Sequence, residues 1–139
     1  MPKSKELTIR MEDEPGKLGH CCRALADHGV NILAFQAFEH EREGVARLLV
    51  DNSQEAKKAL DERGIRYMEQ EVALTTMPSR PGELSRASSK LGGAKINITH
   101  AYCGLDPSSN QPLLIFGVDD VAKAVALLDK LAKEETKAA

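Results

Sequence analysis

Aromatic side chains are scarce in this 139-residue sequence, and tryptophan is missing altogether. Phe, Tyr and Trp make up 4% of the residues, so base-stacking platforms and large aromatic interface anchors are not available in number. No apolar run approaches the length of a membrane-spanning helix, and the opening MPKSKELTIR lacks the apolar stretch of a secretion signal. We therefore expect a cytoplasmic protein with a core of Leu, Ile, Val and Ala.

A large excess of charge of either sign is also missing. The formal net charge is -2, which argues against a nucleic-acid or anionic-membrane surface because both require a basic excess. The three cysteines, two of them adjacent, do not form a disulfide framework, and we expect them to be reduced. A hydrophobic content of 42% with 29% charged residues is typical of a globular rather than a disordered chain.

The sequence contains one Pro-Gly turn twice. EDEPGKL at 12–18 returns as PSRPGEL at 78–84, which places Pro15 and Pro81 66 positions apart. The same shift pairs Leu18 with Leu84, Leu25 with Leu91, Val30 with Ile96, Asn31 with Asn97, Ile32 with Ile98, and Ala56 with Ala122. Matches at a constant spacing predict a tandem repeat, with one unit over 1–71 and a second over 72–139.

The first repeat has the pattern of a βαββαβ unit. Four segments predict strands: ELTIRM (6–11), NILAFQAF (31–38), VARLLVD (45–51) and IRYMEQE (65–71). Pro15 suits the first position of a helix that ends at Gly29. NSQEAKKALDERG predicts a second helix capped by Asn52 or Ser53. We expect an α+β, ferredoxin-like fold, in which both helices cover one face of an antiparallel sheet.

The second repeat copies this order except for its last element. VALTTM, a helix from Pro81 to about Leu91, INITHAYC, PLLIFGV and a helix capped near Asp119 follow in turn. The constant shift places the fourth strand at 131–137, where LAKEETK is charged, poor in β-formers and better suited to extend a helix. We expect that the strand run 65–77 serves both repeats, or that another chain covers the open edge.

The strand segment NILAFQAF is apolar on both of its faces. Helices can cover only one face, so we expect the other to pack against the second repeat or a second subunit. This pattern predicts a homodimer or a higher oligomer.

Each Pro-Gly turn is a candidate site for an anion. A helix start carries unpaired N–H groups and a partial positive charge, and glycine lets a ligand approach the backbone. Asn31 and Asn97 begin the following strands, and an amide can bind the carboxylate and the ammonium of a zwitterion together. We expect turn and Asn to come close at one edge of the sheet. The structural alternatives are a Pro-Gly that only begins a helix and an Asn that only closes a turn.

The combination of strand, EPGKL, helix, GVNI and strand, repeated with RPGEL and KINI, resembles the ACT domain, a regulatory module that binds small molecules, usually amino acids. The resemblance covers nearly the whole chain and is close to small stand-alone proteins made only of tandem ACT domains. It implies a ligand held between paired ACT units by the turn after the first strand and the start of the second. The residues implicated are Glu12, Asp13, Glu14, Gly16, Asn31, Ile32, Ser79, Arg80, Gly82, Asn97 and Ile98.

The two turns differ in charge. Glu12, Asp13 and Glu14 in the first would repel an anion unless they face an ammonium group, whereas Arg80 in the second favours a carboxylate. We expect unequal sites, and the alternative is that these charges only face solvent.

The remaining candidates do not form a catalytic or metal-binding pattern. His20, Cys21 and Cys22 are consecutive on a predicted helix and cannot converge on one tetrahedral ion. His100 and Cys103 face opposite sides of a predicted strand, and we interpret both as packing residues. Phosphate loops, nucleophile elbows and paired-histidine zinc motifs are not found in the sequence, so we expect neither a cofactor nor a metal.

We therefore predict a non-catalytic, allosteric regulatory protein that binds an amino acid between paired ACT units and acts on a partner enzyme. One alternative is an adaptor that regulates a partner enzyme without a ligand. A second is an RNA-binding βαββαβ module, although its third strands, GVARLLV and PLLIFGV, lack the paired aromatics. A third is a small enzyme that uses His100, Tyr102 or Cys103 as catalytic residues. The sequence spacing does not indicate a carboxylate that would orient any of them.

Overall fold

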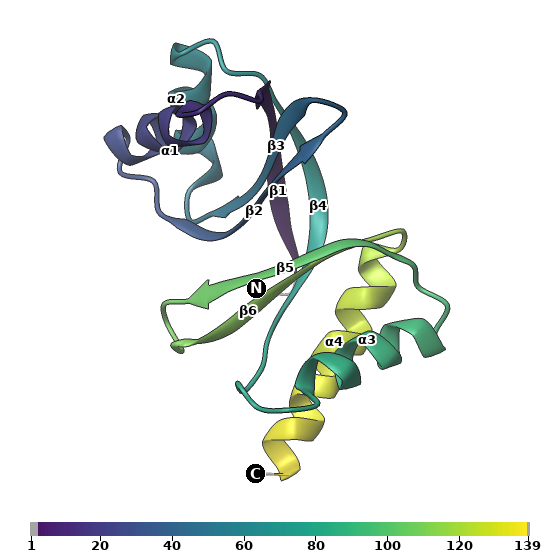
Figure 1. Ribbon diagram of the computed structural model, residues 1–139. Coiled ribbons are helices and arrows are strands. Elements are labelled where there is room, and N and C mark those ends of the chain that lie inside the picture. The colour runs from purple at the N-terminus through teal and green to yellow at the C-terminus, as the bar shows by residue number, and fades with distance from the viewer. Residues whose placement is uncertain (1–2, 139) are drawn as a thin grey trace. The chain divides into compact units, whose positions relative to one another are not determined.

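The computed structural model describes residues 3–138, with side chains up to residue 134 (Figure 1). The elements follow in the order β1 (Lys3–Glu12), α1 (Lys17–Asp27), β2 (Ile32–His40), β3 (Glu43–Val50), α2 (Ser53–Glu62), β4 (Tyr67–Thr76), α3 (Glu83–Gly93), β5 (Ile98–Asp106), β6 (Gln111–Val118) and α4 (Val121–Ala138). The chain divides into an N-terminal unit, residues 5–70, and a C-terminal unit, which combines residues 71–138 with residues 3–4.

The N-terminal unit is an antiparallel sheet covered by α1 and α2. Strand β3 pairs with β1 on one side, where Leu7 faces Leu48, and with β2 on the other. The first residues of β4 also belong to this unit, and Lys5 Nζ of β1 lies 3.7 Å from a Glu69 carboxylate oxygen of β4. The alternating apolar side chains of the strands and one stripe of each helix form a core that includes Leu7, Ile9, Leu25, Leu48, Ala56 and Leu60.

The C-terminal unit repeats this arrangement with one strand fewer. Strand β6 pairs antiparallel with the second half of β4, where Ala73 faces Phe116, and with β5 on its other side. Helices α3 and α4 pack against the same core, which includes Ala73, Ala87, Leu91, Phe116, Ala124 and Leu128. The expected α+β architecture of two tandem ferredoxin-like units is confirmed.

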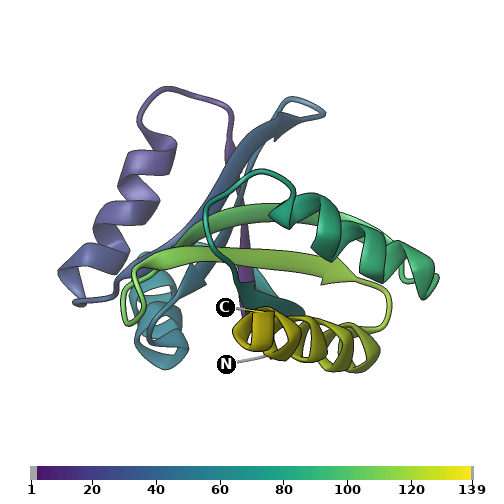
Figure 2. The ribbon, with the colours of Figure 1, turned by 90° about the horizontal axis from the view of Figure 1, so that it is seen from below.

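The segment 131–137, where a fourth strand would fall, is helical. It continues α4, which reaches 18 residues where its counterpart α2 has 10, as one uninterrupted helix (Figure 2). Strand β4 runs unbroken from the N-terminal unit into the C-terminal unit. It therefore serves both units, which was one of the two alternatives predicted for the strand run 65–77. Residues 3–4 of β1 also fall in the C-terminal unit, where Lys3 Nζ lies 3.6 Å from a Glu71 carboxylate oxygen.

The constant shift of 66 positions holds only as far as the β-hairpins. Strands β2 and β3 are joined by two residues, Glu41 and Arg42, whereas β5 and β6 are joined by the four residues 107–110. Beyond that point the shift is 68 positions, so the buried Ala56 of α2 corresponds to the buried Ala124 of α4. The predicted equivalence of Ala56 with Ala122 is wrong, because two extra loop residues turn Ala122 onto the exposed side of α4.

Both Pro-Gly helices begin two residues later than the sequence predicted. Gly16 precedes α1 with φ +88°, and Gly82 precedes α3 with φ +90°, so each glycine is the residue before the helix. This left-handed conformation lies outside the helical region and is one that glycine adopts without strain. Pro15 and Pro81 therefore belong to the turn and not to the first helical position.

Candidate ligand-binding site

Helices α1 and α3 start without a side-chain cap. Within the described chain, no side chain accepts a hydrogen bond at either start, whereas the Asn52 side chain at the start of α2 accepts one from the N–H of Glu55 at 3.1 Å. The first amides make long bonds inside the turns, from Lys17 to the Glu14 carbonyl at 3.3 Å and from Glu83 to the Arg80 carbonyl at 3.4 Å.

Open space lies beside both of these helix starts. A Cβ added at Gly16 or Gly82 would meet no described atom within 4 Å. A ligand can therefore approach the backbone at both turns, where the helix dipole favours an anionic group.

Asn31 and Asn97 are tied down by equivalent backbone contacts. The N–H of Asn31 donates to the Asp51 carboxylate at 2.9 Å, and its carbonyl accepts from the N–H of Asp51 at 3.0 Å. The same exchange joins Asn97 and Asp119 at 3.1 and 3.3 Å. Because these contacts use the backbone of each Asn, its exposed amide side chain is not needed for them.

The two aspartates were missed by the sequence prediction. The signal was present, because an Asp directly follows the last valine of both β3, in LLVD, and β6, in FGVD. The shift of 66 positions places Asp51 against Gly117, and only the shift of 68 that follows the longer hairpin aligns Asp51 with Asp119.

The structure does not bring the turn and the Asn of one unit together. Gly16 precedes α1 and Asn31 follows it, and this helix of 11 residues is about 16 Å long at 1.5 Å per residue. Gly82 and Asn97 are separated by α3 in the same way. The expected approach of turn and Asn within a unit is wrong, because α1 carries the chain from one end of the sheet to the other.

The first turn lies beside a groove of about 800 Å³. The carboxylates of Glu12, Asp13 and Glu14 line it together with three arginines that sequence reasoning missed, Arg10, Arg42 and Arg66. Met11, Tyr67 and Met68 supply apolar surface. A smaller hollow of about 170 Å³ lies between the same turn and Lys17, Leu18 and Phe38. The groove therefore offers both charge signs, which suits a zwitterion better than the turn alone.

The second turn is organised differently. Arg80, predicted to attract a carboxylate, donates from Nε to Glu83 Oε1 at 2.7 Å, and the Glu83 side chain is only 11% exposed. Ser79 and Gly82 are exposed. Ile98, like Ile32 in the N-terminal unit, packs against the core of its unit. The two turns thus differ in structure as well as in charge.

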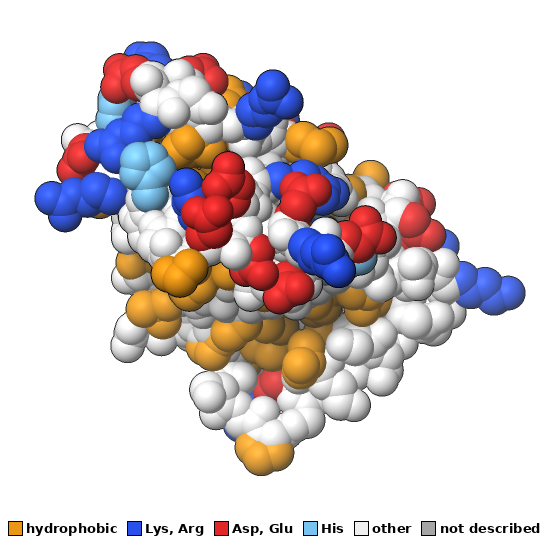
Figure 3. Space-filling view, turned by 45° about the horizontal axis from the view of Figure 1, so that its top comes forward, with side chains coloured by type: hydrophobic (Ala, Val, Ile, Leu, Met, Phe, Trp, Pro, Cys, Tyr) orange, Lys and Arg blue, Asp and Glu red, His pale blue; other side chains and the backbone are white. Residues whose placement is uncertain are grey.

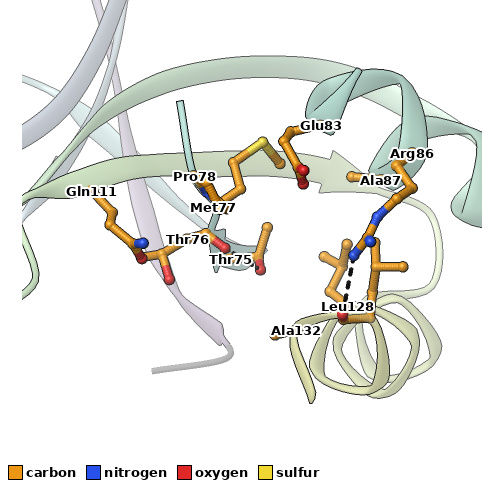
Figure 4. Close-up of a pocket in the computed structure, with 11 residues that line it drawn as sticks. Thr75, Thr76, Met77, Pro78, Glu83, Arg86, Ala87, Gln111, Leu128 and Ala132 are labelled. Atoms are coloured by element: carbon orange, nitrogen blue, oxygen red, sulfur yellow. Dashed lines mark hydrogen bonds between the residues drawn. The ribbon is translucent and has the colours of Figure 1, made fainter. Parts of the chain in front are cut away.

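A separate pocket of about 150 Å³ lies inside the C-terminal unit (Figure 4). Its walls come from the end of β4 with Thr75, from α3 with Glu83 and Arg86, and from α4 with Leu128. The guanidinium of Arg86 reaches across to α4 and donates to the carbonyl of Leu131 at 3.2 Å. No sequence pattern singled out Glu83 or Arg86.

The other candidate residues of the sequence are dispersed. His20 is exposed and Cys21 is buried, and burial raises the pKa of the Cys21 and Cys22 thiols, so the reactive thiolate is disfavoured. Among the described residues, no group of three or more His, Cys, Asp and Glu is placed to hold a metal ion.

The strand β5 carries the remaining candidates. His100 and Tyr102 share a face of β5 and stack with ring centroids 6.2 Å apart. Gly117 faces His100 on β6, and the missing side chain leaves room for the imidazole. Cys103 is exposed, so its interpretation as a packing residue is wrong.

Figure 3 shows the charged side chains on one face of the molecule. On the face drawn in Figure 3, acidic and basic side chains are interspersed. Within residues 3–138, none of the helices combines the length and apolarity needed to cross a membrane.

The fold and the paired turns define a tandem of two like units, and the chain belongs to the family of ACT domain pairs, whose model matches residues 3–138. The resemblance seen in the sequence is confirmed. None of the curated proteins matches the chain.

Several solved structures share the fold. The chain is similar to a protein from Bacteroides thetaiotaomicron with a TM-score of 0.82 and 22% identity, covering 94% of this chain and 89% of that one. It is also similar to the ligand-free regulatory subunit of aspartate kinase from Thermus thermophilus, with a TM-score of 0.63 and 16% identity over 93% and 91% of the two chains. The regulatory subunit of aspartate kinase from Thermus flavus is similar with a TM-score of 0.59 and 17% identity, covering 94% of this chain and 92% of that one.

Proposed function

We propose that this protein is a non-catalytic regulator that binds an amino acid and transmits its occupancy to a partner enzyme. The observation that carries the proposal is the pair of uncapped helix starts at Gly16 and Gly82, each beside open space. Membership of the ACT domain pair family supports it, and so does the fold shared with regulatory subunits of aspartate kinase.

The first turn supplies complementary groups for a zwitterion. The N–H groups at the start of α1 and the arginines of the groove attract its carboxylate, while Glu12, Asp13 and Glu14 attract its ammonium. At the second turn, Arg80 already contacts Glu83, so the ligand is held chiefly by the backbone around Gly82. The two sites are therefore expected to differ in affinity.

The Asn side chain completes each site from another ACT unit, because α1 and α3 separate turn and Asn within a unit. The full set of proposed contacts is Glu12, Asp13, Glu14, Gly16, Asn31, Ile32, Ser79, Arg80, Gly82, Asn97 and Ile98. A ligand bound in this way stabilises one arrangement of ACT units over others, which is the minimum that allosteric control of a partner enzyme requires.

Ligand binding is tested by calorimetry and thermal unfolding of the full chain with each common amino acid. A ligand at 100 times its dissociation constant should stabilise the fold by about 2.7 kcal/mol. If neither an amino acid nor a small carboxylate shifts the unfolding temperature, the protein is an adaptor that works without a ligand.

The Asn contacts are tested by Asn31→Ala and Asn97→Ala. Each should weaken binding by about 1–3 kcal/mol if the amide contacts the ligand. The unfolding temperature should stay unchanged, since the bonds to Asp51 and Asp119 use the backbone. Gln54→Ala, an exposed amide on α2, is the control, and affinities equal to wild type in both Asn variants would contradict the site.

A further inference from the structure

The pocket between β4, α3 and α4 arises from the one element in which the two repeats differ. In the N-terminal unit the chain leaves α2 at Arg63, turns at Gly64 with φ +66° and forms β4. In the C-terminal unit α4 continues as a helix, and Leu131 and Ala132 of this continuation line the pocket. The pocket is therefore a product of the C-terminal unit alone and not a copied feature of the repeat.

Two side chains of opposite charge are held on the wall that α3 contributes. Glu83 and Arg86 are three residues apart and so lie on one face of α3. The Glu83 carboxylate is held by a hydrogen bond of 2.7 Å from Arg80 Nε. The Arg86 guanidinium is held by the 3.2 Å hydrogen bond that it donates to the Leu131 carbonyl. Both groups line the pocket, as Figure 4 shows.

The other walls carry both polar and apolar groups. Thr75, Thr76 and Gln111 supply hydroxyl and amide groups from the strands, whereas Met77, Leu128 and Leu131 supply apolar surface. A guanidinium binds a carboxylate through paired N–H groups, and a carboxylate binds an ammonium. This combination is complementary to the backbone of a free amino acid, and the apolar residues can contact a short side chain.

The pocket volume indicates how large a ligand the pocket can enclose. About 150 Å³ is the size of an engineered protein cavity that holds one benzene molecule, which has about six non-hydrogen atoms. A small amino acid reaches that size with its backbone and a short side chain, whereas aromatic amino acids and nucleotides exceed it.

We propose that this pocket is a second ligand site, which binds a free α-amino acid with a short side chain through Arg86 and Glu83. The inference takes its ligand class from the proposed function, but its location is independent of the turns and of Asn31 and Asn97. In the first repeat, the positions that correspond to Glu83 and Arg86 are occupied by Lys17 and His20, so the charge pair is specific to the C-terminal unit.

Methionine methyl groups can separate this site from the turn site in one experiment. Met77 lines the pocket, whereas Met11 and Met68 line the groove beside the first turn. The full chain labelled with ¹³C at the methionine methyls is titrated with alanine, serine and threonine, and with phenylalanine as the oversized probe. We expect alanine, serine or threonine to shift the Met77 signal in a saturable way and phenylalanine to leave it unchanged.

Two variants and a control complete the test by calorimetry. Arg86→Gln removes the guanidinium. It should raise the dissociation constant of the amino acid that shifts the Met77 signal at least tenfold. Ala132→Trp places a bulky group on the exposed, α4 side of the pocket and should abolish that binding. Arg23→Gln, at an exposed position on α1, should leave binding unchanged, and circular dichroism checks that all three variants are folded.

The outcomes separate this proposal from the proposed function. The pocket proposal is wrong, while the turn site stands, if Arg86→Gln and Ala132→Trp both bind the amino acid with wild-type affinity. It is also wrong if the ligand shifts only the methyl signals of Met11 and Met68. Loss of the Met77 shift in the pocket variants, with the shift retained in Asn31→Ala and Asn97→Ala, supports it. If none of the amino acids binds wild-type protein, both proposals fail.

Discussion

His28, at the end of α1, contacts two carboxylates of α2. Its Nε2 lies 2.8 Å from Glu62 and its Nδ1 lies 3.4 Å from Glu55. The hydrogen bond to Glu62, followed by that to Glu55, raises the pKa of His28 above its ordinary value, and the bond from His28 lowers the pKa of Glu55. The protonated imidazole therefore links the two helices of the N-terminal unit.

This contact predicts a pH-dependent stability. Because the pKa of His28 is higher in the folded than in the unfolded chain, its stabilising effect is full below about pH 6.5 and is lost as the pH rises through the folded pKa. In urea unfolding, wild type should have a higher free energy of unfolding than His28→Gln. This difference should shrink as the pH rises from about 6 to about 8. His20→Gln, at an exposed position on the same helix, is the control. A difference for His28→Gln that is constant with pH would refute the contact.

Two glycines at the start of α1 should respond oppositely to the same substitution. Gly16 has φ +88°, where a Cβ costs about 1–2 kcal/mol, so Gly16→Ala should lower the free energy of unfolding by that amount. Gly19 lies inside α1 with open space around an added Cβ, so Gly19→Ala should raise it by about 1 kcal/mol. A free energy of unfolding for Gly16→Ala that equals or exceeds that of wild type would show that the turn is not left-handed in solution.

At the scale of elements, the four helices begin in two ways. Helices α2 and α4 start with side-chain caps, in which Asn52 accepts from the N–H of Glu55 and Asp120 from the N–H of Lys123, each at 3.1 Å. Within the described chain, α1 and α3 have no such cap. Caps close the helix starts that serve stability and leave open those proposed to bind a ligand.

The capped helices provide a prediction of their own. Asn52→Ala and Asp120→Ala should each lower the free energy of unfolding by about 1 kcal/mol, because an N–H of the first turn loses its acceptor. Gln54→Ala, two residues further along the chain in α2, tests the effect of shortening an exposed side chain without removing a cap. An Asn52→Ala variant as stable as Gln54→Ala would show that the cap contributes nothing measurable.

At the scale of the whole molecule, the proposed ligand contacts the turn of one ACT unit and the Asn of another, so we expect its binding to depend on the pairing of ACT units. We expect the protein to be a homodimer and a saturating ligand to shift its association toward the dimer. Sedimentation velocity at several protein concentrations measures this shift, and Asn31→Ala combined with Asn97→Ala should remove it. A sedimentation coefficient that does not change with ligand in wild type would mean that binding is not coupled to association.

The repeat, the order of its elements and the helical end of the chain were determined by the sequence itself. These features depend on local chemistry, which includes the periodicity of apolar residues, the turn residues and the low β-propensity of LAKEETK. The ACT resemblance followed from the same short patterns, and the family match confirms it. Asn52 as the cap of α2 was also predictable, because its side chain acts on a residue three positions away.

The tertiary structure alone decided which distant residues meet. Whether Gly16 and Asn31 share one end of the sheet depends on the direction of α1, which neither turn encodes. The longer β5–β6 hairpin realigned Ala56 with Ala124 and Asp51 with Asp119. The pocket formed by Glu83, Arg86 and Leu131 joins α3 to the middle of α4. Contacts between residues this far apart depend on the packing of complete elements, and a local pattern carries no information about them.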